Sequence, residues 1–202
     1  MMKKLSFVLC GILLLTSAGL AQTLTPEDRD RGIQYLEQTR DGVVAATKGL
    51  SDAQMKFKPA PDRWSVAETL EHIALAEDFI FQNTREKIMK APAGAADRDT
   101  AKIDKLVLST LPDRSHKAKA PEPLVPTGRW TPAETLDHFL KSRANTIEFL
   151  KTTPDLRAHV VNGPPLGQPL DAYEWLLFIA AHSERHTKQI LEVKADPGFP
   201  KN

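Results

Sequence analysis

Cysteine is almost absent from the sequence, because Cys10 is the only one in 202 residues. A single cysteine excludes an internal disulfide framework and a site built from several thiolates. Charge of one sign is not in excess either: 27 Lys and Arg stand against 26 Asp and Glu. Without a basic patch, we expect no nucleic-acid partner. Any transition-metal site must therefore use histidine and carboxylate side chains.

The N-terminus has the features of a secretory signal peptide. Two lysines precede an almost wholly apolar stretch at residues 5–20, and small residues lead up to Ala21, where a signal peptidase could cleave. The apolar stretch is short for a membrane span. We therefore expect residues 1–21 to be removed, which leaves an exported (periplasmic or extracellular) domain of residues 22–202. That domain would carry no cysteine, no membrane span and a net charge near −1. A retained N-terminal anchor is the alternative.

Helical patterns dominate the rest of the chain, and no alternating strand pattern is long enough to compete. Long helices are predicted over residues 25–48, 65–89, 131–153 and 171–195. Each begins with a good N-cap, and the last three have Glu three residues later, as in a capping box. The cap residues are Thr25, Ser65, Thr131 and Asp171. Four helices of this length predict an all-α fold, an antiparallel four-helix bundle.

The connection between the second and third helices is the longest. Residues 91–129 contain several prolines, and a short helix is predicted near residues 103–111. This segment is either an elaborated crossover or a lid over one end of the bundle. Before the fourth helix, Pro164-Pro165-Leu166-Gly167 predicts a tight and rigid turn.

One nine-residue pattern occurs twice, from Trp64 to His72 and from Trp130 to His138. Each copy has an aromatic residue, an N-cap, a Glu three residues after the cap and a final histidine. We interpret the shared part as a cassette that starts a helix. Duplication of an ancestral two-helix unit is the alternative.

His182 and His186 are four residues apart and therefore share a face of the predicted fourth helix. Apolar residues occupy the same face: Trp175, Phe178, Ile179, Ile190 and Val193. Imidazoles on a buried face need polar partners. A shared metal ion would satisfy both, and we favour it slightly over hydrogen bonds to other core side chains.

This pair does not match two known helical metal motifs. A zincin has Glu directly after its first His, whereas Ser183 holds that position here. Glu184 lies about 200° around the helix from His182, so we expect it to face solvent. A ferritin-like di-iron site needs Glu-x-x-His pairs, which the predicted helices lack.

His72 and His138 are the candidates for a third ligand, and helical geometry separates them. His72 lies at the edge of the apolar face of its helix, next to Ala76. His138 lies nearly opposite the apolar face of its helix, and we expect it to be a solvated surface residue. The predicted metal ligands are therefore His72, His182 and His186.

Three histidine nitrogens leave one coordination position open for water or substrate, as in catalytic metal sites. A metal in such a site polarises a substrate oxygen or lowers the pKa of a bound water or thiol. Zinc is the first choice of divalent ion for these ligands, while nickel, iron, manganese and copper also accept them.

Three further polar side chains are candidates to support the site, although none is identified as catalytic. Glu77 lies in the apolar face of the second helix, where it either bonds a buried histidine or arginine or tilts to the surface. Arg185 and Gln189 flank the histidine face, and for Arg185 we favour surface packing or a salt bridge over contact with ligands or substrate. The tryptophans Trp64, Trp130 and Trp175 are interpreted as core anchors, and His116 and His159 belong to no constellation.

Two groups of residues, in fixed order, form a recognisable pattern. The first is Trp64-Ser65 with Glu68 and His72-Ile73; the second is Glu174-Trp175 followed by His182-x-x-Arg185-His186-x-x-Gln189-Ile190. In this pattern the chain resembles the DinB-like family, four-helix bundles regarded as metal-dependent enzymes. The resemblance covers nearly the whole mature chain. Carried over residue by residue, it implies a three-histidine metal site at His72, His182 and His186.

Characterised members of that family include thiol-dependent S-transferases and a mycothiol-dependent isomerase, in which the metal activates a small thiol. The resemblance therefore implies a small-molecule substrate or thiol as partner. Two departures count against thiol chemistry. The signal peptide would carry the protein away from the reduced cytoplasm, and residues 91–129 could reshape the mouth of the site.

Three functions remain open at this point. The first is an exported metal-dependent enzyme, a transferase or a hydrolase, that acts on a small molecule. The second is a non-catalytic metal-binding protein. The third is a purely structural bundle whose histidines are hydrogen-bonded to other residues. The sequence does not decide the oligomeric state, and a homodimer is one option.

Overall fold

The computed structural model describes residues 23–161 and 166–201. The predicted signal peptide, residues 1–21, and the Pro164-Pro165 part of the predicted turn lie outside them. Gly167, at the end of that turn, has a φ of +67°, a left-handed conformation that glycine adopts without strain. Within the described residues, no helix has both the length and the apolar content that a membrane span needs.

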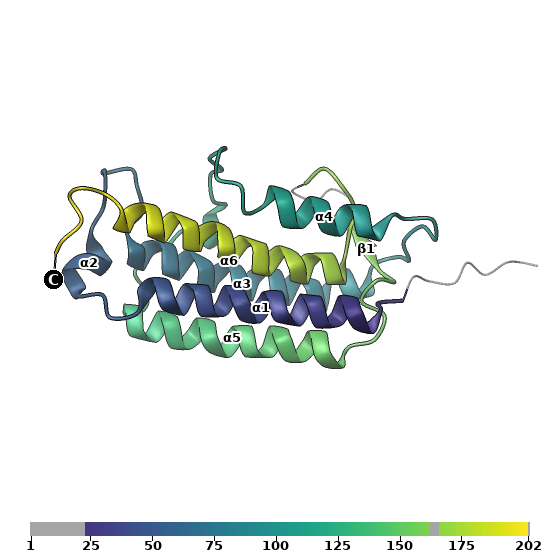
Figure 1. The fold of residues 1–202 in the computed structure, drawn as a ribbon. Coiled ribbons are helices and arrows are strands. Elements are labelled where there is room, and N and C mark those ends of the chain that lie inside the picture. The colour runs from purple at the N-terminus through teal and green to yellow at the C-terminus, as the bar shows by residue number, and fades with distance from the viewer. Residues whose placement is uncertain (1–22, 162–165, 202) are drawn as a thin grey trace, which may run out of the picture.

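Four long helices lie side by side and form a bundle (Figure 1). They are α1 (Pro26–Thr47), α3 (Val66–Glu86), α5 (Pro132–Thr152) and α6 (Ala172–Lys194). The predicted all-α four-helix bundle is confirmed. All four predicted cap side chains accept a hydrogen bond from the backbone N–H three residues later, and full capping boxes start α3, α5 and α6. These local bonds explain why the helix starts could be predicted from sequence.

Smaller elements lie in the connections. They are α2 (Asp52–Lys56), η1 (Ile88–Lys90), α4 (Thr100–Thr110), η2 (Glu122–Leu124), and the antiparallel strands β1 (Val160–Val161) and β2 (Leu170–Asp171). The short helix predicted near residues 103–111 is confirmed as α4. The predicted second helix ends at Glu86 rather than Met89, because the chain tightens into η1. Neither α2 nor the strands were predicted.

The long connection between α3 and α5 is a crossover. Asp78 of α3 hydrogen-bonds His138 of α5, and Phe81 packs against Phe149 further along both helices. The two helices therefore run in the same direction, so the antiparallel arrangement predicted for the bundle does not hold for this pair. In contrast, α1 runs opposite to α3, and α5 opposite to α6 (Figure 1). Two parallel neighbours can be joined only by a connection that returns along the bundle. Of the two predicted alternatives for this segment, the crossover is the one observed, and it carries α4 and η2.

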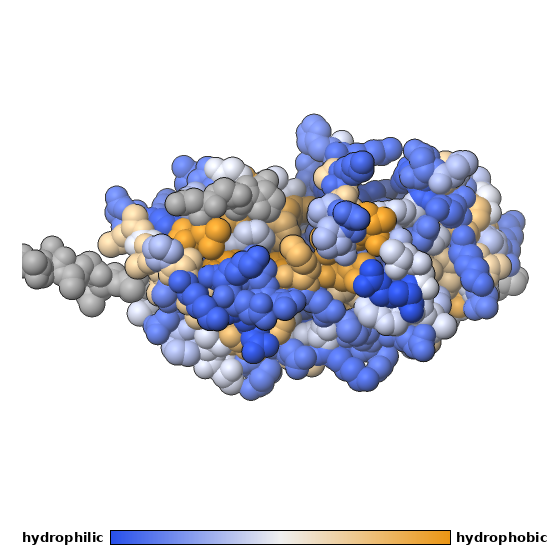
Figure 2. Space-filling view, turned by 180° about the vertical axis from the view of Figure 1, so that it is seen from behind, coloured by the Kyte–Doolittle hydropathy of each residue, from blue (hydrophilic) through white to orange (hydrophobic). Residues whose placement is uncertain are grey.

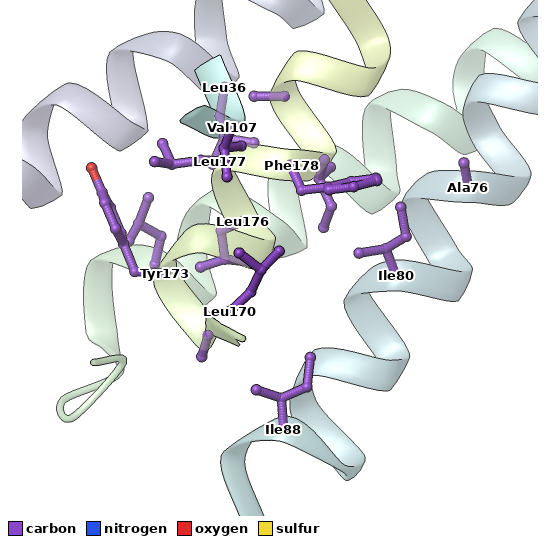
Figure 3. Packing of buried hydrophobic residues seen from close by; sticks show 14 of the residues in the cluster. Leu36, Ala76, Ile80, Ile88, Val107, Leu170, Tyr173, Leu176, Leu177 and Phe178 are labelled. Carbon is purple, nitrogen blue, oxygen red and sulfur yellow. The ribbon is translucent and has the colours of Figure 1, made fainter. Parts of the chain in front are cut away.

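Two apolar clusters form the core. In the larger one, Leu176 and Leu177 of α6 lie with Leu36 of α1 and Val107 of α4 (Figure 3). The smaller cluster gathers residues from the other halves of the long helices, among them Ile190 of α6. Along α6, the segment that carries the two predicted metal-binding histidines lies between the residues of these clusters.

Candidate metal centre

Three histidines converge between α3 and α6. His72, His182 and His186 each bring one ring nitrogen within 4.8 Å of the others. The centroids of their rings are 4.4 to 5.0 Å apart. The capping boxes that start α3 and α6 set the register of both helices, and the i, i+4 spacing aligns His182 with His186. The structure thus brings together the three histidines that the sequence singled out.

His72 is oriented by a backbone carbonyl of the crossover. Its Nδ1–H donates to the carbonyl oxygen of Leu124, in η2, at 2.7 Å. A carbonyl can only accept, so Nδ1 carries the hydrogen and Nε2 keeps the lone pair that a metal needs. The residue is 3% exposed, and the Trp64 ring lies 4.8 Å away, centroid to centroid. Trp64 therefore packs on a histidine of the cluster, a role beyond the predicted core anchor.

His186 is oriented in the same way by a side chain of its own helix. Its Nδ1–H donates to Oε1 of Gln189 at 2.9 Å, which leaves Nε2 with a lone pair. Gln189 thus belongs to the surroundings of the site, as the sequence indicated.

His182 is surrounded by aromatic rings. It lies against His72 and His186, and its ring stacks on Phe178 at 6.3 Å between centroids. In the described part of the chain, no hydrogen-bond partner reaches its ring nitrogens. Among the described residues, the ring nitrogens of His182 thus approach only the two other histidines of the cluster, and they are available to a ligand.

Burial keeps all three imidazoles neutral at pH 7. Desolvation first, and then the neighbouring His72, lower the pKa of His186 to about 3. Desolvation also lowers the pKa of His72, although the Leu124 carbonyl opposes the shift. The pKa of His182 is well below its usual value, first through burial and then through repulsion from the other two histidines. Neutral imidazole is the form that binds metal ions.

His138 lies away from the cluster, on α5. Its Nε2 hydrogen-bonds Asp78 at 2.5 Å, and its ring stacks on Trp130 with 4.4 Å between centroids. Its side chain is 36% exposed. His138 is therefore less solvated than predicted, because Trp130 covers one face of its ring.

Glu184 also faces solvent only in part. Glu184 accepts a hydrogen bond from the Tyr35 hydroxyl at 2.7 Å and forms an ion pair with Lys188 at 2.7 Å. Its side chain is 34% exposed. Glu184 was predicted to face solvent, but α1 packs along this side of α6 and covers part of the side chain.

A buried ion pair holds the middle of the bundle together. Arg143 of α5 donates to both carboxylate oxygens of Glu77 at 2.9 and 2.7 Å, and both side chains are completely buried. The remaining donors of Arg143 bond the Leu36 carbonyl, Thr39 and Ser183. Glu77 thus follows the first predicted alternative, a bond to a buried arginine. Arg143 itself was missed, although it stands four residues after Phe139 in the apolar stripe of α5.

Arg185 ties α6 to the crossover. Its guanidinium donates to the carbonyl oxygens of Leu111, Asp113 and His116. This is the surface-packing role that we favoured for Arg185, with backbone carbonyls in place of a salt bridge. His116 and His159 lie outside the three-histidine cluster.

A cavity of about 670 Å³ opens on another side of α6, between α1 and α4. Its walls include Tyr35, Tyr173 and Leu177, and none of the three clustered histidines. The large cavity and the histidine cluster are therefore separate features. The view from behind shows another face of the molecule, on which apolar residues are exposed among polar ones (Figure 2).

The donor set fits a divalent metal ion. The three residues offer neutral nitrogens, and two of them are already held in the tautomer with a free Nε2. Histidine nitrogens bind zinc at roughly 2.0–2.1 Å, and the three nitrogens, within 4.8 Å of one another, form a group that could hold one ion. The burial of His72 and His186 would shield such an ion from bulk water on the protein side.

Comparisons with known proteins agree with this fold. The "uncharacterized protein YuaE" of Bacillus subtilis (strain 168) is 29% identical over 151 residues, which cover 73% of this chain and 87% of that protein. The solved structure of YfiT from Bacillus subtilis, described as a probable metal-dependent hydrolase with an unusual four-helix bundle topology, matches with a TM-score of 0.55 at 16% identity. That match covers 88% of this chain and 91% of YfiT. The family model of the DinB superfamily matches residues 35–190. With most of its length matched by that model, the chain belongs to the DinB superfamily.

Proposed function

We propose that this protein binds one divalent metal ion through His72, His182 and His186 and acts with it as an exported enzyme on a small molecule. The observation that carries the proposal is the convergence of three neutral imidazoles, with nitrogens within 4.8 Å of one another. Zinc is the first choice for such ligands, and nickel, iron, manganese and copper are the alternatives.

A bound ion would supply Lewis-acid chemistry, polarising a substrate oxygen or lowering the pKa of a water molecule. The protein's own residues do the positioning. Leu124 and Gln189 hold the rings of His72 and His186. Trp64 packs on the ring of His72, and Phe178 stacks on the ring of His182.

Hydrolysis is the reaction that we propose first. The similar fold of YfiT belongs to a protein described as a probable metal-dependent hydrolase. An exported protein would also meet few of the small thiols that transferases of this superfamily use. Transfer of a thiol to an electrophilic substrate is therefore the second choice.

Activity assays test the enzyme proposal. The zinc-loaded protein is incubated with a panel of carboxylic esters, phosphate esters and amides, and separately with a thiol and an electrophile. We expect turnover of one substrate class that His72→Ala abolishes and His138→Ala leaves unchanged. Equal activity in wild type and His72→Ala would contradict the proposal.

A non-catalytic metal-binding protein is the second candidate. It is favoured by the position of the large cavity, which the three histidines do not line. Under this alternative the wild type takes up one ion but turns over no member of the panel, with or without added metal.

Export has its own test. N-terminal sequencing of the protein from the periplasm or the culture medium should give Gln22 as the first residue. A mature protein that starts at its original N-terminus would contradict cleavage after Ala21 and favour a retained anchor.

A further inference from the structure

Gln189 orients His186, but its side-chain amide has two ends with opposite hydrogen-bonding character. With the oxygen toward His186, Nδ1 carries the hydrogen and Nε2 keeps its lone pair. With the NH₂ group toward His186, Nδ1 must accept, so the hydrogen moves to Nε2 and blocks that nitrogen as a metal ligand. The usefulness of His186 therefore depends on which end of the amide faces it.

Arg114, from the crossover after α4, selects the oxygen. Its NH1 group donates to Oε1 of Gln189 at 3.2 Å, and His186 Nδ1 lies 2.9 Å from the same oxygen. A guanidinium can only donate. If the amide turned over, its NH₂ group would face this cation and both hydrogen bonds to the oxygen would be lost.

Arg114 is itself held in place. Its Nε and NH2 groups donate to the two carboxylate oxygens of Glu192 at 2.6 and 2.7 Å, a bidentate pair that fixes the guanidinium plane. The segment around it is fastened independently by Arg185, and by Lys188, whose Nζ lies 3.4 Å from the Pro112 carbonyl oxygen. Removal of the Arg114 guanidinium should therefore leave the path of the crossover intact.

We propose that Arg114 is a positioning residue of the metal site, which acts through Gln189 to keep His186 in the tautomer with a free Nε2. The inference rests on the metal site proposed above. It gives the crossover a role at two of the three ligands, because Leu124 of the same segment fixes the tautomer of His72. The segment that joins α3 to α5 thus prepares the histidines of α3 and α6.

The tautomer of His186 can be read directly in the metal-free protein by long-range ¹H–¹⁵N NMR at pH 7. Wild type should show the Nδ1–H form alone, and Arg114→Met should show a mixture with the Nε2–H form. Arg63→Met is the matched control, because Arg63 approaches the same Glu192 carboxylate at 3.7 Å and has no described bond to Gln189. An unchanged His186 tautomer in Arg114→Met would overturn the proposal.

A double variant separates positioning from general damage. In Arg114→Met/Gln189→Glu, the carboxylate at position 189 can only accept, so it should restore the Nδ1–H form without the arginine. Failure of this double variant to restore the tautomer, while its fold is intact by circular dichroism, would also overturn the proposal.

Titration with Co²⁺, followed by its visible absorption, measures the consequence for metal binding. Arg114→Met should weaken the affinity by about 10- to 100-fold, the usual effect of removing a group that orients a ligand. Arg63→Met and the double variant should bind as wild type does. Equal affinity in Arg114→Met would contradict the positioning role. Absence of Co²⁺ binding in wild type would instead contradict the metal site itself, and the NMR result would then decide the role of Arg114 alone.

Discussion

At the scale of single residues, the most demanding feature of the bundle is the Arg143–Glu77 pair. Two opposite charges lie completely buried, where the loss of hydration is compensated only because nearly every donor and acceptor has a partner. The pair connects α5 to α3 directly, and through Ser183 it reaches the residue next to His182. We infer that it fixes the spacing of α3 and α6, the two helices that carry the histidines.

Arg143→Met should therefore destabilise the protein strongly. It leaves the Glu77 carboxylate buried without its cation, and breaking a buried pair in this way costs about 3–5 kcal/mol. The measurement is the free energy of unfolding in urea at pH 7. Lys141→Met removes the exposed partner of Asp137, with 73% of the lysine side chain exposed, and should change stability by less than about 1 kcal/mol. Similar losses in the two variants would contradict the role of the buried pair.

Single residues also show which features of the site could be predicted from the sequence. His72 and His138 end matching cassettes. Only the direction in which each faces on its helix distinguished the predicted metal ligand, His72, from the predicted surface residue, His138. The helical repeat alone sets these directions, so they could be predicted from the sequence. The partner of Gln189 could not be found in the same way, because Arg114 is 75 residues away along the chain and nothing local indicates where the crossover folds back.

At the scale of elements, glycine in α1 sets how closely the helices approach. A Cβ on Gly32 would lie 2.8 Å from Cε2 of Tyr173 and 3.0 Å from Cδ2 of Leu150. A Cβ on Gly42 would meet its nearest neighbour, Cγ2 of Thr187, at an ordinary 3.8 Å. The two glycines lie in the same helix, so substituting each in turn distinguishes the effect of close packing on stability from the effect of helix propensity.

Gly32→Ala should lower the free energy of unfolding by about 1–3 kcal/mol, because overpacking outweighs the better helix propensity of alanine. Gly42→Ala should raise it by about 0.5–1 kcal/mol, since only the propensity changes. Thermal unfolding of the two variants checks both signs. Stabilisation by Gly32→Ala would show that α1 does not approach α5 and α6 as closely as described.

The start of α6 should make stability depend on pH. Burial first, and then repulsion from Asp171, raise the pKa of Glu174 to about 8 from its usual 4.5. The folded state therefore holds this proton more tightly than the unfolded state, so the contribution to stability is complete below pH 4.5 and is lost as the pH rises through 8.

Glu174→Gln isolates this effect because glutamine does not titrate. In urea unfolding between pH 5 and 9, wild type should lose stability relative to Glu174→Gln as the pH rises. A difference that stays constant, or that moves in favour of wild type at high pH, would contradict the raised pKa.

The elements also show where prediction from sequence succeeded and failed. Caps and apolar stripes are local, and they gave the four helix starts and the helical face of each histidine. α2 carries a local signal as well, the Ser51–Gln54 capping box, but it is only five residues long and was overlooked. The strands β1 and β2 depend on pairing across a connection, which no single segment encodes.

At the scale of the whole molecule, the crossover explains how the site is assembled. It returns the chain so that α5 runs parallel to α3, and on its way it places Leu124 against His72 and Arg114 against Gln189. The length of the segment between α3 and α5 indicated an unusual connection. The direction in which the segment runs, however, follows from the packing of the whole bundle. Because the crossover orients two of the three ligands, we expect the metal site to depend on the entire fold rather than on α6 alone.

The most direct test of the central claim is the metal content of the purified full chain, measured by elemental analysis. We predict about one divalent ion per chain in wild type, the same amount in His138→Ala, and none in His182→Ala/His186→Ala. His138 is the matched control, because it ends the same cassette as His72 but lies outside the cluster. Wild-type protein without bound metal after incubation with zinc, or a double variant that keeps its ion, would contradict the three-histidine site.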